Sequence, residues 1–330
     1  MESQAMTPRE HQHRVHVMIA FLLVYVFWGS TYLAIRIAVE HIPAAMLGAT
    51  RFLIAGVLML IYCGLSGRKI SLTRRDAFRL AIIGVLLLSG GNVLLAYSEE
   101  YVPSGLAALI VAVVPLWVAL IEGFILKGDR LRGLGWVGLF LGIGGLVVLL
   151  WPQVAPVLVP GRTQGAAESG MLFASGVLLL GSLSWSIGSI VSRRSSLGVG
   201  PVAATGWEMT FAGAFNLLVS LAHGDLHTVA WSWRGIGAVA YLVVFGSWVG
   251  FTAYIWLLEH VPTPKVATYA YVNPVVAVFL GWLLLHEHVD RYIGIGAVVI
   301  VAAVALVTSS KLKLSSAPKQ ELLPACEAEA

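Results

Sequence analysis

The stretch Leu134–Trp151, LGWVGLFLGIGGLVVLLW, contains only apolar residues and glycine. A helix needs about 20 predominantly apolar residues to cross about 30 Å of hydrocarbon, and this run approaches that length. The whole chain has the same character, since 58% of its 330 residues are hydrophobic and 12% are charged. Soluble proteins carry about 25% charged residues. The chain is therefore predicted to be an all-α integral membrane protein.

Further apolar runs flank this stretch on both sides, and together they predict ten transmembrane helices. A helix satisfies its own backbone polar groups in lipid, and the runs are longer than the strands of a membrane barrel. The ten runs are roughly Val17–Ala38, Ala44–Leu65, Ala77–Tyr97, Ser104–Leu126, Leu134–Trp151, Ser169–Val191, Val202–Ala222, Gly235–Leu258, Val266–Leu285 and Tyr292–Ser309.

Lysine and arginine are distributed unevenly between the loops that join these runs. With the N-terminus placed in the cytoplasm, sixteen of the 21 Lys and Arg residues fall in cytoplasmic segments. Four fall in outer segments, and Arg51 lies within a helix. Because cytoplasmic loops carry an excess of Lys and Arg, both termini are predicted to be cytoplasmic. The loop that contains Glu99 and Glu100 is then outside.

The two halves of the chain match each other. A shift of 157 positions places Trp28 on Trp185, and a shift of 159 places EYVP, 100–103, on EHVP, 259–262. Because five helices is an odd number, the second half is expected to be inverted, as in many secondary transporters. The predicted segments are a cytoplasmic N-terminus 1–16, a first five-helix repeat 17–151, a periplasmic linker 152–168, a second five-helix repeat 169–309 and a cytoplasmic tail 310–330.

Several short motifs lie at the ends or in the middle of the runs. They are Trp28-Gly29-Ser30-Thr31, Arg51-Phe52, Pro115-Leu116, Asn273-Pro274-Val275 and Leu285-His286-Glu287. Over about residues 17–309 the chain thereby resembles the EamA family of the drug/metabolite transporter superfamily. The resemblance implies a 5+5 inverted repeat and a central cavity lined mainly by helices 1, 3, 4, 6, 8 and 9. It also implies movement of amino acids, sugars or other metabolites, often outward. Gly128-Asp129 departs from the family's Gly-Glu, a change that says little about the substrate.

Proline interrupts two of the predicted helices near their middle. Pro115 and Pro274 are repeat equivalents, and each removes a backbone donor and frees a carbonyl about one turn earlier. In lipid, such a carbonyl must face protein or a wet cavity. These two prolines, Asn273 and the mid-helix Asn92 are therefore candidate substrate-binding residues. Ordinary kinks, and amides that join helices, are the alternative interpretation.

Aromatic and hydroxyl side chains supply further candidates for substrate binding. Trp28 and Tyr32 share a face of the first helix, and Trp185 and Ser189 are their repeat equivalents on the sixth. Aromatic walls with a few polar groups suit a largely apolar small solute. The alternative is that these side chains only pack the helices together.

Three charged residues, Arg51, Glu122 and Glu208, lie within predicted helices. Each costs about 2.5–3.5 kcal/mol at the membrane centre on insertion scales, so a partner or water is expected. Glu122 or Glu208 could bind a coupling proton or an amine. A structural ion pair or a gate is the alternative, with Lys127 and Arg130 within reach of Glu122.

Other functional classes have little support in the sequence. His286-Glu287-His288 lacks the i,i+4 spacing of a zinc helix, so no metal site is predicted. No nucleotide-binding glycine-rich loop is present and no cofactor is expected. The basic residues lie in short loops between apolar runs, which is unlike a nucleic-acid footprint.

The sequence therefore predicts a secondary transporter of a bacterial inner membrane rather than an enzyme. It would move a small metabolite, such as an amino acid, by alternating access, in the direction of efflux. Its expected partners are the solute, the lipid bilayer and a coupling proton. A channel, a non-transporting receptor and a membrane-embedded enzyme are the alternatives. The substrate and the oligomeric state are not readable from the sequence.

Overall fold

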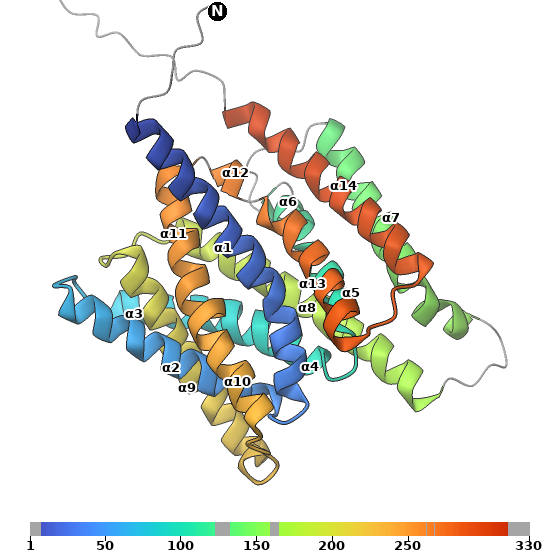
Figure 1. Cartoon of the computed structure of the whole chain (residues 1–330), viewed down its shortest axis with the longest axis horizontal. Coiled ribbons are helices and arrows are strands. Elements are labelled where there is room, and N and C mark those ends of the chain that lie inside the picture. The colour runs from blue at the N-terminus through green and yellow to red at the C-terminus, as the bar shows by residue number, and fades with distance from the viewer. Residues whose placement is uncertain (1–7, 123–132, 159–164, 262, 267, 316–330) are drawn as a thin grey trace, which may run out of the picture.

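The computed structural model describes residues 8–122, 133–158, 165–261, 263–266 and 268–315 (Figure 1). Every regular element within these residues is a helix, which confirms the predicted helical class. In the same part of the chain, six helical segments are long and apolar enough to cross a membrane: Gln12–Val39, Ala44–Leu65, Arg74–Ser98, Gly133–Leu158, Glu168–Arg194 and Trp233–Leu258. Shorter apolar helices cover Ser104–Leu120, Tyr269–Leu285 and Arg291–Val307.

The described parts of the ten predicted apolar runs fall on helical elements, except for turns at 112–113 in the fourth run and at Thr268 in the ninth. In chain order the elements are α1 Pro8–Val39, α2 Ala44–Leu65, α3 Arg74–Gly84, η1 Val85–Val93, α4 Leu94–Ser98, α5 Ser104–Val111, α6 Val114–Leu120, α7 Gly133–Val154, η3 Ala155–Leu158, α8 Ala166–Arg194, α9 Pro201–His223, η4 Asp225–His227, α10 Trp233–Tyr241, η5 Leu242–Val249, α11 Gly250–His260, α12 Thr263–Val266, α13 Tyr269–Leu285 and α14 Arg291–Ser315. Helix α7 and η3 thus extend into the segment 152–168, predicted as a linker, from one side, and α8 extends into it from the other. Helix α14 extends into the predicted tail 310–330. The end of the predicted fourth run, 123–126, lies outside the described residues.

Helices α2 and α9 pack along each other at two glycines. A side chain at Gly56 would meet Thr210, and one at Gly213 would meet Leu53. The shift of 157 places Gly56 on Gly213 and Leu53 on Thr210, so the same contact occurs twice at this interface. Small residues that let two backbones approach closely are typical of membrane helix pairs.

Replacing Gly213 with alanine is expected to destabilise the protein by about 1–3 kcal/mol, the usual cost of overpacking. The added methyl carbon would lie 2.6 Å from the backbone nitrogen of Leu53, and a backbone atom cannot rotate away. Thermal unfolding in detergent measures the effect, with Gly144→Ala as the control, because a methyl group there meets nothing within 4 Å. Equal melting temperatures for the two variants would contradict the close packing.

A second close pair, α7 and α14, lies side by side at the edge of the view in Figure 1. Gly138 and Gly145 of α7 face Val307 and Ile300 of α14. Large apolar side chains on the other face of α7, such as Phe140, are exposed, as expected for a surface that contacts lipid.

Two long helical segments change to π-helix near their middle. The segment Arg74–Ser98 contains η1, and the segment Trp233–Leu258 contains η5. The sequence analysis did not predict these changes, because π-helical turns leave no periodic apolar signal. Such turns are rare and frequent at functional sites. Helix α8 packs against η1, and α1 packs against η5. Since the shift of 157 relates α1 to α8, the two π-helical segments occupy matching places in the two halves.

Candidate functional site

Trp28 of α1 lies at the centre of an aromatic cluster. Its Nε1 donates to the carbonyl of Gly246 in η5 at 3.2 Å. Its ring centroid is 5.2 Å from Phe251 and 5.0 Å from Tyr254 in α11, and 5.2 Å from Tyr269 in α13. One partly buried indole therefore joins three segments that are distant in sequence, which fits the predicted role of Trp28 in lining a site.

Trp28 and its repeat equivalent Trp185 each pack against a glycine in a helical segment that contains π-helix. A methyl group at Gly250 would overlap Trp28, and a methyl group at Gly91 would lie 2.7 Å from the ring of Trp185. The shift of 157 relates the two tryptophans, and the shift of 159 relates the two glycines. The contact between α1 and α11 is thus repeated between α8 and η1.

Two further contacts, made by the residues that precede Trp28 and Trp185 in the chain, also occur at repeat-equivalent positions. Phe27 stacks on Phe245 with ring centroids 4.7 Å apart, and at the equivalent positions the hydroxyl of Ser184 donates to the carbonyl of Leu86 at 2.8 Å. The residue types differ but the positions correspond. Positions that are equivalent in the sequence repeat therefore also make equivalent contacts in the structure.

The prolines act differently at their two sites. The helix is interrupted between α5 and α6, and Pro115 is the second residue of α6. The hydroxyl of Ser186 on α8 donates mainly to the carbonyl of Ser182 in its own helix at 2.7 Å, and it lies 3.3 Å from the carbonyl of Val114 beside this break. Pro274 lies buried inside α13 and does not end it. The fourth run is thus broken just before its proline, whereas α13 is continuous through Pro274.

Asn273, one residue before Pro274, is 7% exposed, and its Oδ1 has no hydrogen-bond partner among the described residues. Its backbone carbonyl faces Gly29 of α1, beside Trp28. An amide acceptor buried without a partner is costly, so this oxygen is available to a bound solute. Asn273 is thus a polar candidate on the helix that carries Tyr269 of the aromatic cluster.

The remaining polar candidates, Tyr32, Asn92 and Ser189, have different surroundings. Tyr32 packs against the main apolar core and lies within electrostatic reach of Tyr269. Asn92 is partly buried in η1, next to the glycine under Trp185. Ser189 donates to a carbonyl of its own helix at 2.8 Å, so its hydroxyl is already engaged.

The three intramembrane charges have separate surroundings. Arg51 is buried, donates to the hydroxyl of Ser247 at 3.2 Å and lies over the ring of Phe52. Glu208 is buried where α9 crosses α3, and its backbone lies against Gly84. Arg51 therefore joins α2 to η5, and Glu208 sits at a different helix crossing.

Glu122 forms an ion pair with Arg193 of α8 at 2.9 Å. This agrees with the structural or gating alternative for Glu122. The Arg193 guanidinium is also within electrostatic reach of the Tyr254 and Tyr269 hydroxyls. Lys127 and Arg130, the partners considered from the sequence, lie outside the described residues.

Sequence reasoning missed a group of charges at the opposite end of the bundle. Both carboxylate oxygens of Glu287 accept backbone hydrogen bonds at the start of α5, from Ser104 at 2.8 Å and Gly105 at 3.0 Å. Arg36 of α1 donates to the carbonyl of Glu99, whose side chain is completely buried. The only sequence signal was the place of Glu287 in a motif, which indicates a helix end but not the partner helix.

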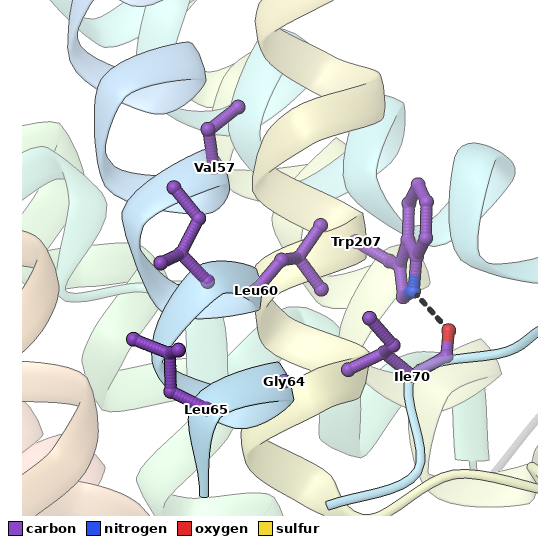
Figure 2. A pocket seen from close by; sticks show the side chains of 7 residues that line it. Val57, Leu60, Gly64, Leu65, Ile70 and Trp207 are labelled. Carbon is purple, nitrogen blue, oxygen red and sulfur yellow. Dashed lines mark hydrogen bonds between the residues drawn. The ribbon is translucent and has the colours of Figure 1, made fainter. Parts of the chain in front are cut away.

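A groove open to the surroundings lies between α2 and Trp207 of α9 (Figure 2). It has a volume of about 450 Å³ and is lined by residues such as Val57, Leu60 and Leu65 of α2. At its rim, Nε1 of Trp207 donates to the carbonyl of Ile70 at 2.9 Å. Its lining is apolar, and Leu65 is 85% exposed. This groove suits a lipid chain and is separate from the tryptophan cluster.

Comparison with known proteins matches the chain to one family. The model of the EamA-like transporter family matches residues 16–151 and 170–309. The uncharacterized inner membrane transporter YedA of Escherichia coli K12 is 38% identical over 300 residues, covering 91% of this chain and 92% of its own length. The uncharacterized transporter YoaV of Bacillus subtilis is 22% identical, covering 89% of this chain and 97% of its own.

A solved crystal structure supports the fold alone. It superposes with a TM-score of 0.59 at 20% sequence identity, over 91% of this chain and 99% of the solved one. A WAT1-related chloroplastic protein of Arabidopsis thaliana is 26% identical and covers 86% of this chain and 67% of its own length.

Proposed function

The chain belongs to the EamA-like transporter family, and from this premise we propose that it is a secondary carrier that moves a small metabolite across the inner membrane by alternating access. It is a multi-pass membrane protein, with six long apolar helices in its described part. Its E. coli relative is named an inner membrane transporter, which supports the same membrane for this chain.

The proposed architecture is ten membrane helices in two inverted five-helix units, with both termini in the cytoplasm. The family model matches each half separately. Helix α2 packs on its repeat equivalent α9, and α7 packs on its repeat equivalent α14. The bias of Lys and Arg supports the orientation. A pseudo-twofold axis in the membrane plane would pass between α2 and α9 and between α7 and α14.

The observation that carries the proposal is a difference in burial between repeat-related positions. Leu109 is 0% exposed, whereas its equivalent Thr268 is partly exposed. Glu99 is 0% exposed, whereas its equivalent Leu258 is 38% exposed. At these two positions the proposed outer end is thus packed more tightly than the proposed inner end. Alternating access needs this inequality, because exchanging it between the ends moves the opening across the membrane.

The proposed solute is a small amphipathic metabolite of the amino-acid type. The cluster around Trp28, Tyr254 and Tyr269 offers aromatic walls, and the free acceptor of Asn273 suits an ammonium or amide donor. Small-molecule sites combine such apolar walls with few polar groups. Outward movement is proposed on the family resemblance.

Counterflow in reconstituted vesicles tests this function. Vesicles preloaded with each of the twenty amino acids in turn are expected to accumulate the same labelled amino acid transiently for at least one member of the panel. Flux should saturate with concentration. A channel would give no counterflow, and a receptor would bind solute without any flux; either result would contradict the proposal.

The proposed inward-open state makes a labelling prediction. In a background without native cysteines, Thr268→Cys is expected to react with a maleimide added to inside-out membrane vesicles, and its repeat equivalent Leu109→Cys is expected to be protected. The reason is the difference in burial between the two positions. Equal reactivity of the two cysteines would contradict the assigned state.

A further inference from the structure

A completely buried carboxylate lies at the proposed outer end of the bundle. Glu99 follows the last residue of α4, is 0% exposed, and neither of its carboxylate oxygens has a hydrogen-bond partner among the described residues. A buried ionised carboxylate without hydrogen bonds is expensive. Neutralisation by a proton is the usual solution.

Three titratable or charged groups face Glu99 from the elements packed around it. Arg36 and Tyr32 come from α1, and Glu287 comes from the loop between α13 and α14. Burial raises the pKa of Glu99 well above its ordinary value, and the charge of Glu287 raises it further, while Arg36 opposes both. Because Arg36 donates to the backbone carbonyl of Glu99 and Glu287 accepts from α5, this one cluster joins spans 1, 3, 4 and 9.

A small crevice lies next to this cluster. A crevice of about 10 Å³ is bordered by Glu287, Pro103 and His288. This volume is close to the smallest that can hold one water molecule. The crevice therefore borders the Glu287 side of the carboxylate pair, while Glu99 itself stays enclosed.

The opposite end carries the repeat-related arrangement without the buried acid. Arg36 corresponds to Arg193, which pairs with Glu122. Glu122 corresponds to Gly281, and the carboxylate of Glu287 fills the place that a side chain at Gly281 would take. Both ends thus have an arginine and a carboxylate, but only the outer end adds Glu99.

We propose that Glu99 is a proton-binding site and that its proton holds the outer end of the carrier closed. This proposal rests on the proposed function and concerns the control of one of its two gates. Loss of the proton leaves two carboxylates facing each other in a buried space, and separation of spans 1, 3, 4 and 9 relieves this by admitting water. At the inner end, Arg193 and Glu122 form a partly exposed ion pair, and the position equivalent to Glu99 is Leu258, which cannot titrate.

The direction of the pH dependence follows from linkage. Between the ordinary pKa of a glutamate and the raised pKa of Glu99, the closed state holds more protons than an open state in which water reaches Glu99. The contribution to closure is complete below the ordinary pKa, and it is lost as pH rises through the raised value. The outer end is therefore expected to open as the outer pH increases.

Infrared titration of the reconstituted protein, with no solute present, tests the site. In a Glu208→Gln background, which removes the other buried glutamate, the protein is expected to show the carbonyl stretch of a protonated acid that titrates above the ordinary range for glutamate, and adding Glu99→Gln should abolish it. Glu287→Gln keeps an acceptor oxygen for α5 and should move the midpoint to lower pH. Glu122→Gln, at the inner end, is the control and should leave the midpoint unchanged. An unaltered titrating signal in Glu99→Gln would overturn the proposal.

A labelling experiment tests the gate. In the same cysteine-free background, Val102→Cys, which replaces a residue that is 0% exposed, should react with an impermeant maleimide from outside increasingly as pH rises. Adding Glu99→Gln, which mimics the protonated acid, should keep it protected at every pH. Reaction that does not vary with pH would overturn the gate. Both readouts need no solute, so an absence of counterflow would refute transport without touching the proton site.

Discussion

Replacing Gly250 with alanine is expected to lower saturable solute flux about ten- to a hundredfold in reconstituted vesicles. A methyl group at this position would overlap the indole of Trp28. The indole is held by its bond to Gly246 and enclosed by the rings of Tyr254 and Tyr269, so it cannot move without disturbing the cluster. Overpacking costs about 1–3 kcal/mol, which corresponds to about a ten- to hundredfold change in an equilibrium constant.

The repeat makes this prediction sharper, because Gly91→Ala should impair flux to a similar degree by displacing Trp185. Gly237→Ala is the matched control in the same long segment as Gly250, since a methyl group there meets nothing within 4 Å. Initial rates of counterflow give the comparison, with the melting temperature in detergent showing that each variant is folded. Wild-type rates in both Gly250→Ala and Gly91→Ala would remove the tryptophan cluster from the solute path.

Asn273→Ala is expected to abolish solute flux while leaving the stability of the protein unchanged or higher. The side-chain oxygen of Asn273 is buried and has no hydrogen-bond partner among the described residues. Leaving such a group unsatisfied costs about 1–3 kcal/mol, so its removal relieves the empty carrier. A loss of transport without a loss of stability is the signature of a group kept for a ligand, whereas a helix-joining amide would lose stability first.

The control for this substitution is Asn216→Ala. The nitrogen of the Asn216 amide is also buried without a partner among the described residues, but it lies against Gly48 at the α2–α9 interface and not beside Trp28 in the ring contacts that the structure shows. Its removal should leave flux at the wild-type rate. Thermal unfolding and counterflow are measured for both variants, and a drop in melting temperature with normal flux in Asn273→Ala would contradict the site assignment.

Much of the candidate site could be anticipated, because the repeat marks equivalent positions in the chain. Trp28 and Trp185 occupy matching places, and the structure gives each a matching glycine. What could not be anticipated was the partner of each charge. Glu122 pairs with Arg193 from a distant helix, and Arg51 bonds Ser247, since residues 71 and 196 positions apart meet only once the helices are packed.

The amino-acid sequence by itself determined that the chain is helical, lives in a membrane and is built from two related halves. These properties depend on the length and polarity of continuous runs, and the transfer of such runs into lipid is decided run by run. Only the tertiary structure decided that Glu99 is enclosed and that Glu287 caps a helix from the other half. Burial and electrostatic environment arise when several helices meet, so no single run of residues contains them.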